Sequence, residues 1–111
     1  MKPFFFSALL VLAGCASQLP EHVALQPAAQ EVDIAFETPS RNTFADVGKI
    51  TAEGAGKEVD EAQAAARNDL RNKAAALGAT LVTIDQETGE GVLLQGKTLV
   101  TLVGHAYKAM D

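Results

Sequence analysis

Alternating apolar and polar positions predict two strands in the first half of the folded region. Residues 31–36 alternate apolar side chains with polar or small ones, which is the pattern of a short, half-buried strand. The turn-forming run 38–42 ends it, and 44–52 predicts a second strand. Glycines at 54 and 56 are followed by neither a third glycine nor a Gly-Lys-Ser pattern, so they favour a flexible turn over a phosphate cradle.

Helical spacing of apolar residues predicts one helix between Asp60 and Gly78. Asp60 is a suitable N-cap, with Gln63 three residues later in a pair that resembles a capping box. Gly78 is a natural helix stop, because glycine readily adopts positive φ. Small residues on the apolar stripe would let this helix lie close to a sheet. The stripe comprises Ala62, Ala66, Leu70, Ala74 and Leu77.

The last third of the chain reads as strands joined by polar turns. We expect a strand at 79–84, a polar turn at 85–91 and the longest strand at 97–107, while 92–95 either extends a ribbon or packs over the core. That last strand is apolar on both alternating faces, which predicts a central strand covered on part of each face. The predicted fold class is α+β, with a mainly antiparallel sheet of about four strands and one helix packed on it, in the order ββαββ over 31–111.

The N-terminus has the pattern of a secretion signal. One basic residue precedes the apolar run 4–12, which is much shorter than the roughly 20 residues of a transmembrane helix. The residues Leu12, Ala13, Gly14 and Cys15 then resemble the lipobox of bacterial lipoproteins. In that motif an aliphatic and two small residues are recognised by the signal peptidase, and the cysteine thiol receives the lipid.

This resemblance implies a three-part chain. Residues 1–14 would be a signal peptide removed before Cys15, and 15–30 would be the lipidated cysteine and a flexible tether, since that stretch has two prolines and little periodicity. Cys15 is the only cysteine, so an intrachain disulfide is excluded. Ala16 after the cysteine favours the outer membrane, with the domain facing the periplasm.

Composition narrows the classes of partner. The chain of 111 residues has a formal net charge of -5 and a pI near 4.9, which is the wrong sign for binding nucleic-acid phosphates. It also has no polybasic cluster that would hold it to an anionic membrane surface. Membrane attachment is therefore expected through the lipid on Cys15, and we predict no other cofactor.

Candidate chemistry in the predicted domain is sparse. His105 lies near the end of the last strand, which favours a hydrogen-bonded histidine at the sheet margin over a catalytic or ligand role. Asp85, Glu87 and Glu90 favour a solvated acidic turn over a weak cation site. His22 stands alone in the tether. With no metal-ligand spacing, we predict no metal and no enzyme activity.

The middle of the predicted helix, 67–73, is unusually polar. Two interpretations stay open, an exposed face with charge pairs or a surface that docks a partner. The candidate docking residues are Arg67, Asn68, Arg71, Asn72 and Lys73.

The segment 66–80 resembles the helix-to-strand region of small proteobacterial outer-membrane lipoproteins of unknown function. These are similar in turn to the stress-sensing lipoprotein of the Rcs phosphorelay. The likeness extends to 47–50 and 104–108. Relatives carry cysteines at the places of Phe44 and Ala109, so the resemblance does not transfer signalling that depends on a disulfide.

Together these features predict a non-enzymatic envelope lipoprotein whose domain binds another envelope protein as a sensor, adaptor or assembly accessory. Two alternatives stay open. One is a structural envelope lipoprotein without a specific partner. The other is a small ligand-binding protein or enzyme, which would need polar groups converging in a pocket.

Overall fold

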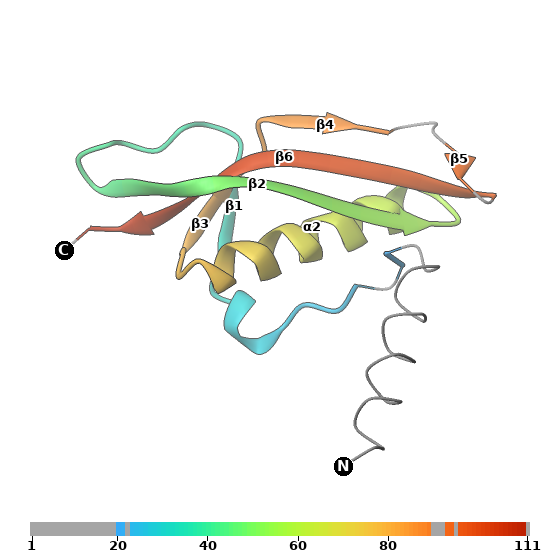
Figure 1. The fold of residues 1–111 in the computed structure, drawn as a ribbon, viewed down its shortest axis with the longest axis horizontal. Helices are drawn as coiled ribbons and strands as arrows, with labels where there is room; N and C mark the ends of the chain where they lie inside the picture. Colours follow the sequence, from blue (N-terminus) through green and yellow to red (C-terminus); the bar gives the residue numbers. More distant parts are fainter. Residues whose placement is uncertain (1–19, 22, 90–92, 95, 111) are drawn as a thin grey trace, which may run out of the picture.

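The computed structural model describes residues 20–21, 23–89, 93–94 and 96–110, which form a helix packed on one face of a sheet (Figure 1). The predicted signal peptide 1–14 and the lipobox cysteine Cys15 lie outside the described residues, as does His22. The α+β class with one helix on a mainly antiparallel sheet is confirmed.

The sheet is organised around its last strand, β6 (Lys97–Ala109), which runs the length of the molecule. One edge of β6 pairs with β2 (Phe44–Gly56), antiparallel, from Thr98 to Ala109. The main path of the sheet is β1-β3-β6-β2, and β1 pairs with β3 in parallel. The other edge of β6 carries three short antiparallel partners, β3 (Leu81–Thr83), β4 (Gln86–Thr88) and β5 (Leu93–Leu94), and β1 (Asp33–Ala35) lies beyond β3.

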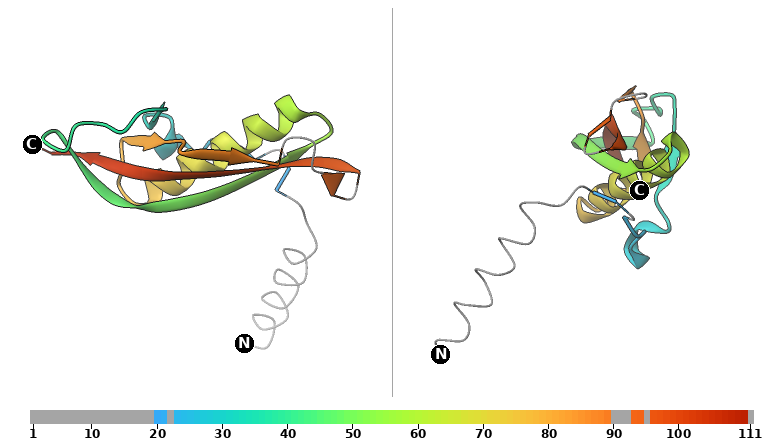
Figure 2. Two further views of the ribbon diagram at one scale, coloured as in Figure 1. Left: turned by 90° about the horizontal axis from the view of Figure 1, so that it is seen from above. Right: turned by 90° about the vertical axis from the view of Figure 1, so that its right-hand side faces the viewer.

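The two faces of the sheet differ in how they are covered. The residues of β6 that face the helix are buried, including Val100 and Leu102. The alternate residues, such as Leu99 and Val103, are only half-buried, and among the described residues no helix packs on their face (Figure 2). The prediction that β6 is central and covered on part of each face is confirmed, because its residues are buried on the side of α2 and half-buried on the other side.

Helix α2 (Val59–Ala76) begins two residues earlier than its capping pattern predicted. Its N-cap is Glu58, with no side-chain cap, and the side chain of Gln63 instead hydrogen-bonds the carboxylate of Glu87 at 2.7 Å. The predicted capping box at Asp60 is therefore wrong. The stop at Gly78 is confirmed, because its φ is +77°.

The core consists of small side chains held at close range. Of the predicted stripe, Leu77 is 47% exposed and thus does not belong to the core, while Ala65 does. The helix approaches β2 so closely that a Cβ on Gly54 would lie 2.1 Å from the backbone nitrogen of Ala66. The core side of α2 comprises Ala62, Ala65, Ala66, Leu70 and Ala74.

Two regions that the sequence predicted to be turns belong to strands in the structure. Residues 54–56 are the end of β2, because their glycines give α2 the space it needs. Residues 86–88, inside the predicted turn 85–91, form β4 along β6. Backbone pairing with the long strand outweighs the polar character of this segment. The predicted ribbon at 92–95 is confirmed for Leu93–Leu94, and the remainder of it lies outside the described residues.

Residues 20, 21 and 23–32, here called the strap, lie along the outer side of α2 and include the short 3-10 helix η1 (Pro27–Ala29). Most of the strap falls within the tether predicted at 15–30. Because it is hydrogen-bonded to the helix and to β2, the packed domain begins at Pro20 at the latest, rather than at Glu31.

Candidate functional site

The asparagines predicted to dock a partner bind the strap instead. Asn68 donates from Nδ2 to the carbonyl of Val23 at 2.8 Å. The amide of Asn72 makes two bonds, donating to the carbonyl of Ala24 at 2.9 Å and accepting from the N–H of Gln26 at 2.9 Å. A side-chain amide that pairs with backbone groups two residues apart recognises extended chain and not a particular side chain.

Arg71 holds the end of the strap where it enters β1. Its Nε donates to the carbonyl of Val32 at 2.8 Å, and its Nη2 donates to the carbonyl of Gln30 at 3.0 Å. Val32 is buried, and Ala29 is the other buried strap residue. A charged donor fork that reaches two carbonyls is stronger than a neutral pair, so this end is fixed most firmly.

The first described residues of the strap meet the far end of β2 and β6. The N–H of Ala55 donates to the carbonyl of Pro20 at 3.0 Å. Glu21 forms an ion pair with Lys97, the first residue of β6. We call this the anchored end of the molecule, since the strap begins here.

The same helix also covers the outer edge of β2. The carboxylate of Asp69 accepts the N–H of Glu53 at 3.0 Å, and Lys73 donates to the carbonyl of Thr51 at 2.9 Å. Asp69 and Lys73 are themselves paired at 3.1 Å. An unpaired strand edge promotes unwanted strand pairing, and these side chains block this one.

The predicted docking residues are therefore largely engaged within the chain. Asn68, Arg71 and Asn72 bind the strap and Lys73 caps β2, while Arg67 is exposed. Their hydrogen-bonding groups do not form a free surface.

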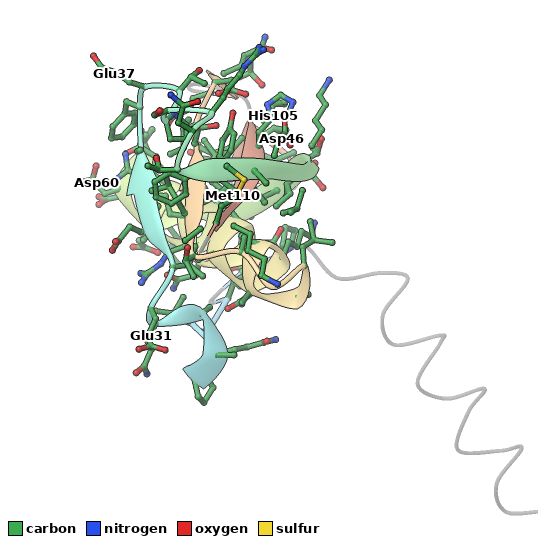
Figure 3. The ribbon with its side chains drawn as sticks, turned by 90° about the vertical axis from the view of Figure 1, so that its left-hand side faces the viewer. Glu31, Glu37, Asp46, Asp60, His105 and Met110 are labelled. Carbon is green, nitrogen blue, oxygen red and sulfur yellow. The ribbon has the colours of Figure 1, made fainter. Side chains whose placement is uncertain are left out.

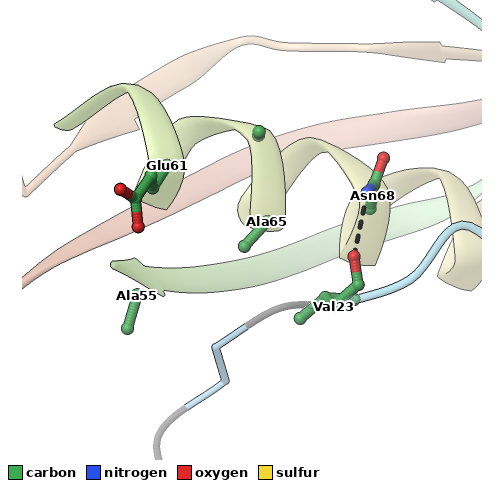
Figure 4. Close-up of a pocket in the computed structure, with 6 residues that line it drawn as sticks. Val23, Ala55, Glu61, Ala65 and Asn68 are labelled. Carbon is green, nitrogen blue, oxygen red and sulfur yellow. Dashed lines mark hydrogen bonds between the residues drawn. The ribbon is translucent and has the colours of Figure 1, made fainter. Parts of the chain in front are cut away.

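A groove of about 480 Å³ remains between strap and helix (Figure 4). Three of its lining residues are alanines, two on the helix and one on β2, so little side-chain volume fills the space beside the strap. The groove is lined by Val23, Ala55, Glu61, Ala64, Ala65 and Asn68. The strap is therefore held along this stretch more by directed hydrogen bonds than by packing.

His105 lies on the sheet face opposite α2 (Figure 3). Its Nδ1 is 2.7 Å from Oδ2 of Asp85, whose Oδ1 accepts the hydroxyl of Thr83 at 2.9 Å. The Thr83 oxygen in turn accepts the N–H of His105 at 3.1 Å. As predicted, the histidine is hydrogen-bonded within the sheet, where this network joins β3 to β6.

The acidic residues do not converge. Asp85 faces His105, Glu87 accepts from Gln63, and Glu90 lies outside the described residues. Within the part of the chain that the structure describes, no three His, Cys, Asp or Glu side chains are grouped as a metal would require.

The end of β6 opposite Lys97, here called the distal end, exposes apolar side chains. Met110 follows β6 and is 47% exposed, and Leu77, also 47% exposed, lies beside Gly48 of β2, which pairs with Ala106. Phe36, 69% exposed, follows β1 and lies level with the middle of β6, because Ala35 pairs with Thr83. At roughly 3.3 Å per residue, β6 separates the distal end from the anchored end by about 40 Å. A pocket of about 370 Å³ opens there, lined by Thr38, Arg41, Phe44, Ala45, Asp46, Tyr107 and Met110.

Tyr107 is the ionisable phenol of this pocket. Burial raises the pKa of its hydroxyl, and the negative charges of Asp46 and Asp85 raise it further. The Arg41 guanidinium and a hydrogen bond with Thr38 oppose this rise in pKa. The phenol is thus kept neutral, as a hydrogen-bonding group at the edge of an apolar pocket.

These features define a small α+β domain with a bound N-terminal strap, one covered sheet face and an apolar distal end. The chain belongs to the family described as a domain of unknown function, DUF4156, whose model matches residues 23–109. No curated protein matched the chain. The family match begins at Val23, which is hydrogen-bonded to the helix, and ends with β6, so it includes residues 23–32 of the strap. No helix among the described residues is long and apolar enough to span a membrane.

Proposed function

We propose that this protein is a lipid-anchored lipoprotein of the bacterial envelope whose domain is a non-enzymatic protein-binding module. The lipid is carried by Cys15, and the domain faces the periplasm from the outer membrane. The module acts on another envelope protein as a sensor, adaptor or assembly accessory.

The observation that carries this proposal is that the anchored end and the distal end lie at opposite ends of β6. Cys15 precedes Pro20 by five residues, and five residues span at most about 18 Å in any conformation. Pro20 and Glu21 are bound at the anchored end, so that end stays near the bilayer. The distal end then stands away from the membrane by the length of β6.

The surface at the distal end supports protein binding. Large apolar side chains exposed next to a pocket are typical of surfaces that other proteins cover. Leu77 and Met110 lie there, together with the pocket that includes Arg41 and Asp46. The acidic charge of the chain disfavours nucleic acid, which leaves a protein of the envelope as the partner.

Lipid attachment is tested by growing cells with a clickable palmitate analogue. We expect label on the wild-type protein and none on a Cys15→Ala variant, with Ala16→Ser as the control that keeps the cysteine. Unlabelled wild-type protein would contradict the anchor.

Partner binding is tested by crosslinking with mass spectrometry in native cells. We expect one dominant envelope partner with the lipidated protein, lost on Cys15→Ala and on Met110→Ser, since Met110 is exposed and lines the distal pocket. The matched control is Lys57→Ser, because Lys57 is also exposed but follows β2 at the anchored end. Equal recovery of abundant neighbours from all four proteins would instead favour a structural role without a specific partner.

A further inference from the structure

We propose that the strap is a detachable latch that sets how far the domain stands from the membrane. When docked, it holds the anchored end at the bilayer. When released, it becomes a spacer that lets the domain move outward. This inference rests on the proposed function, in which Cys15 carries the lipid.

The bonds of the strap are of a kind that can open separately from the core. From Pro20 to Gln30 it is held by hydrogen bonds to Asn68, Asn72, Arg71 and the edge of β2, and by the ion pair of Glu21. Segments with few buried apolar contacts open at a lower free energy than the fold as a whole. In this stretch Ala29 is the one described residue that is buried.

Release of the strap does not require α2 to move. The helix packs on the sheet through its opposite side, where Leu70 and Ala66 are fully buried. Val32 belongs to the core cluster and keeps its bond to Arg71, so it is a fixed point at which the released segment stays attached. The amide of Asn72 is partly exposed already, so water can replace the backbone groups it loses.

Opening changes both reach and orientation. With the strap docked, five residues separate Cys15 from its first bound residue, Pro20, which allows about 18 Å. With it released up to Val32, seventeen residues separate them, which allows about 60 Å. The point of attachment also moves from the Lys97 end of β6 to the start of β1. A domain held at the membrane can thereby become one that reaches a partner farther away.

The latch is tested first on the soluble Cys15→Ala protein by amide hydrogen exchange, which does not depend on the lipid. The reporters are the N–H of Gln26, bound to Asn72, and the N–H of Ala55, bound to Pro20. We expect both to exchange faster than the amides of the β2–β6 ladder. Exchange of the reporters at the ladder rate would overturn the proposal, since the strap would then open only with the whole fold.

A matched pair of variants tests the clamp itself. Asn72→Ala removes two hydrogen bonds and should speed exchange at Gln26 by about tenfold, with ladder amides unchanged. Arg67→Ala, at an exposed position of the same helix, should leave both sets unchanged. Equal behaviour of the two variants would overturn the role of Asn72 as the clamp.

The change in reach is tested with lipidated protein on supported bilayers of phosphatidylethanolamine and phosphatidylglycerol, by measuring the height of the protein layer with neutron reflectometry. Asn72→Ala should raise the layer relative to Arg67→Ala. A protein with Ala24→Cys and Asn72→Cys, joined by a short bismaleimide, should stay low. Equal heights for the open and joined proteins would overturn the spacer role, whereas a failure to bind the bilayer would count against the lipid anchor and leave the exchange result standing.

Discussion

Helix α2 binds the rest of the chain on two sides, and it does so by different means. Its inner side presents alanines and Leu70 to β2, where Gly54 lets the two backbones come close. Its outer side presents Asn68, Arg71 and Asn72, which hold the strap through the backbone. The inner contact depends on shape and apolar burial, whereas the outer one depends on the direction of a few polar bonds.

The difference matters because the two kinds of contact fail differently. A close-packed contact has no room to adjust, so a small change there is felt by the whole fold. A set of side-chain to backbone bonds can be lost one at a time, each with a modest net effect, because water replaces the missing partner. One helix thus combines a fixed side with a releasable one.

The largest effect is expected from filling the space on the inner side. In Gly54→Val the new Cβ would meet the backbone of Ala66 and Ala62, which cannot rotate away. We expect a loss of about 3 kcal/mol or more in the free energy of unfolding, the upper range for overpacking. Urea denaturation measures it.

The control is Gly96→Asn, because Gly96 has φ +78° with open space around it and asparagine tolerates that conformation. A Gly54 variant as stable as this control would show that helix and sheet are not in tight contact, and the contrast between the two sides would be lost.

The strongest bond of the outer side should come next. Arg71→Ala frees the carbonyls of Val32 and Gln30, and we expect a loss of about 2 kcal/mol, because charged hydrogen bonds contribute more than neutral ones. Arg71→Lys should recover part of it, since one donor can still reach a carbonyl. Thermal unfolding of both variants measures the difference. A loss for Arg71→Ala as large as that for Gly54→Val would mean that the outer side is part of the core.

A smaller effect is expected at the protected edge of β2. Asp69→Ala leaves the N–H of Glu53 without its acceptor and Lys73 without its ion pair, for a loss of about 1 kcal/mol. The open edge should also promote self-association, which sedimentation at rising concentration detects. Asp69→Asn keeps an acceptor and is the control. Identical sedimentation of both variants would show that Asp69 does not guard this edge.

The smallest effect is expected on the pKa of Tyr107, with the fold unchanged. Tyr107 is the single tyrosine, so its ionisation can be followed by absorbance. Its pKa is raised by burial and by Asp46, so Asp46→Asn should lower the midpoint, while Asn72→Ala on the strap side should leave it alone.

The linked effect on stability has a definite sign. Because the folded pKa of Tyr107 lies above that of the unfolded chain, its contribution is complete below about pH 10 and is lost as the pH rises through the folded pKa. A Tyr107 midpoint that moves with Asn72→Ala would show that strap opening is not local.

Elements with a local cause were predictable. The helix followed from its apolar period and its glycine stop, and β6 followed from a long run of β-branched and aliphatic residues. The residues at which the helix and strands begin and end were harder to predict. Asp60 and Gln63 form a plausible capping pair, yet Gln63 is drawn to Glu87 on β4, a contact between segments far apart in the chain.

The misread regions depend on distant neighbours. Glycines 54 and 56 have the local character of a turn, and only the approach of α2 makes them strand residues. The small-residue stripe on the helix indicated close packing on a sheet, and the matching glycines on the strand were the second half of that signal. Polar residues 86–88 become a strand because β6 is long enough to pair with them.

The strap could not be predicted from periodicity, because helix side chains 39 to 48 positions away in the sequence hold its backbone. The polar middle of α2 did signal that something binds there. What bound was the chain itself. The lipobox pattern, in contrast, consists of consecutive residues, so it can be identified without knowledge of the fold.

The position of β6 in the chain also governs when this protein can fold. Strands β2, β4 and β5 pair with β6 and, among the described residues, with no other strand, and β3 otherwise has only short β1 beside it. A chain still emerging from a ribosome or a translocation channel, with residues 97–109 not yet released, therefore has almost no sheet to form. The sheet can therefore form only after the last strand is released, and until then the chain stays unfolded enough to pass through a translocation channel.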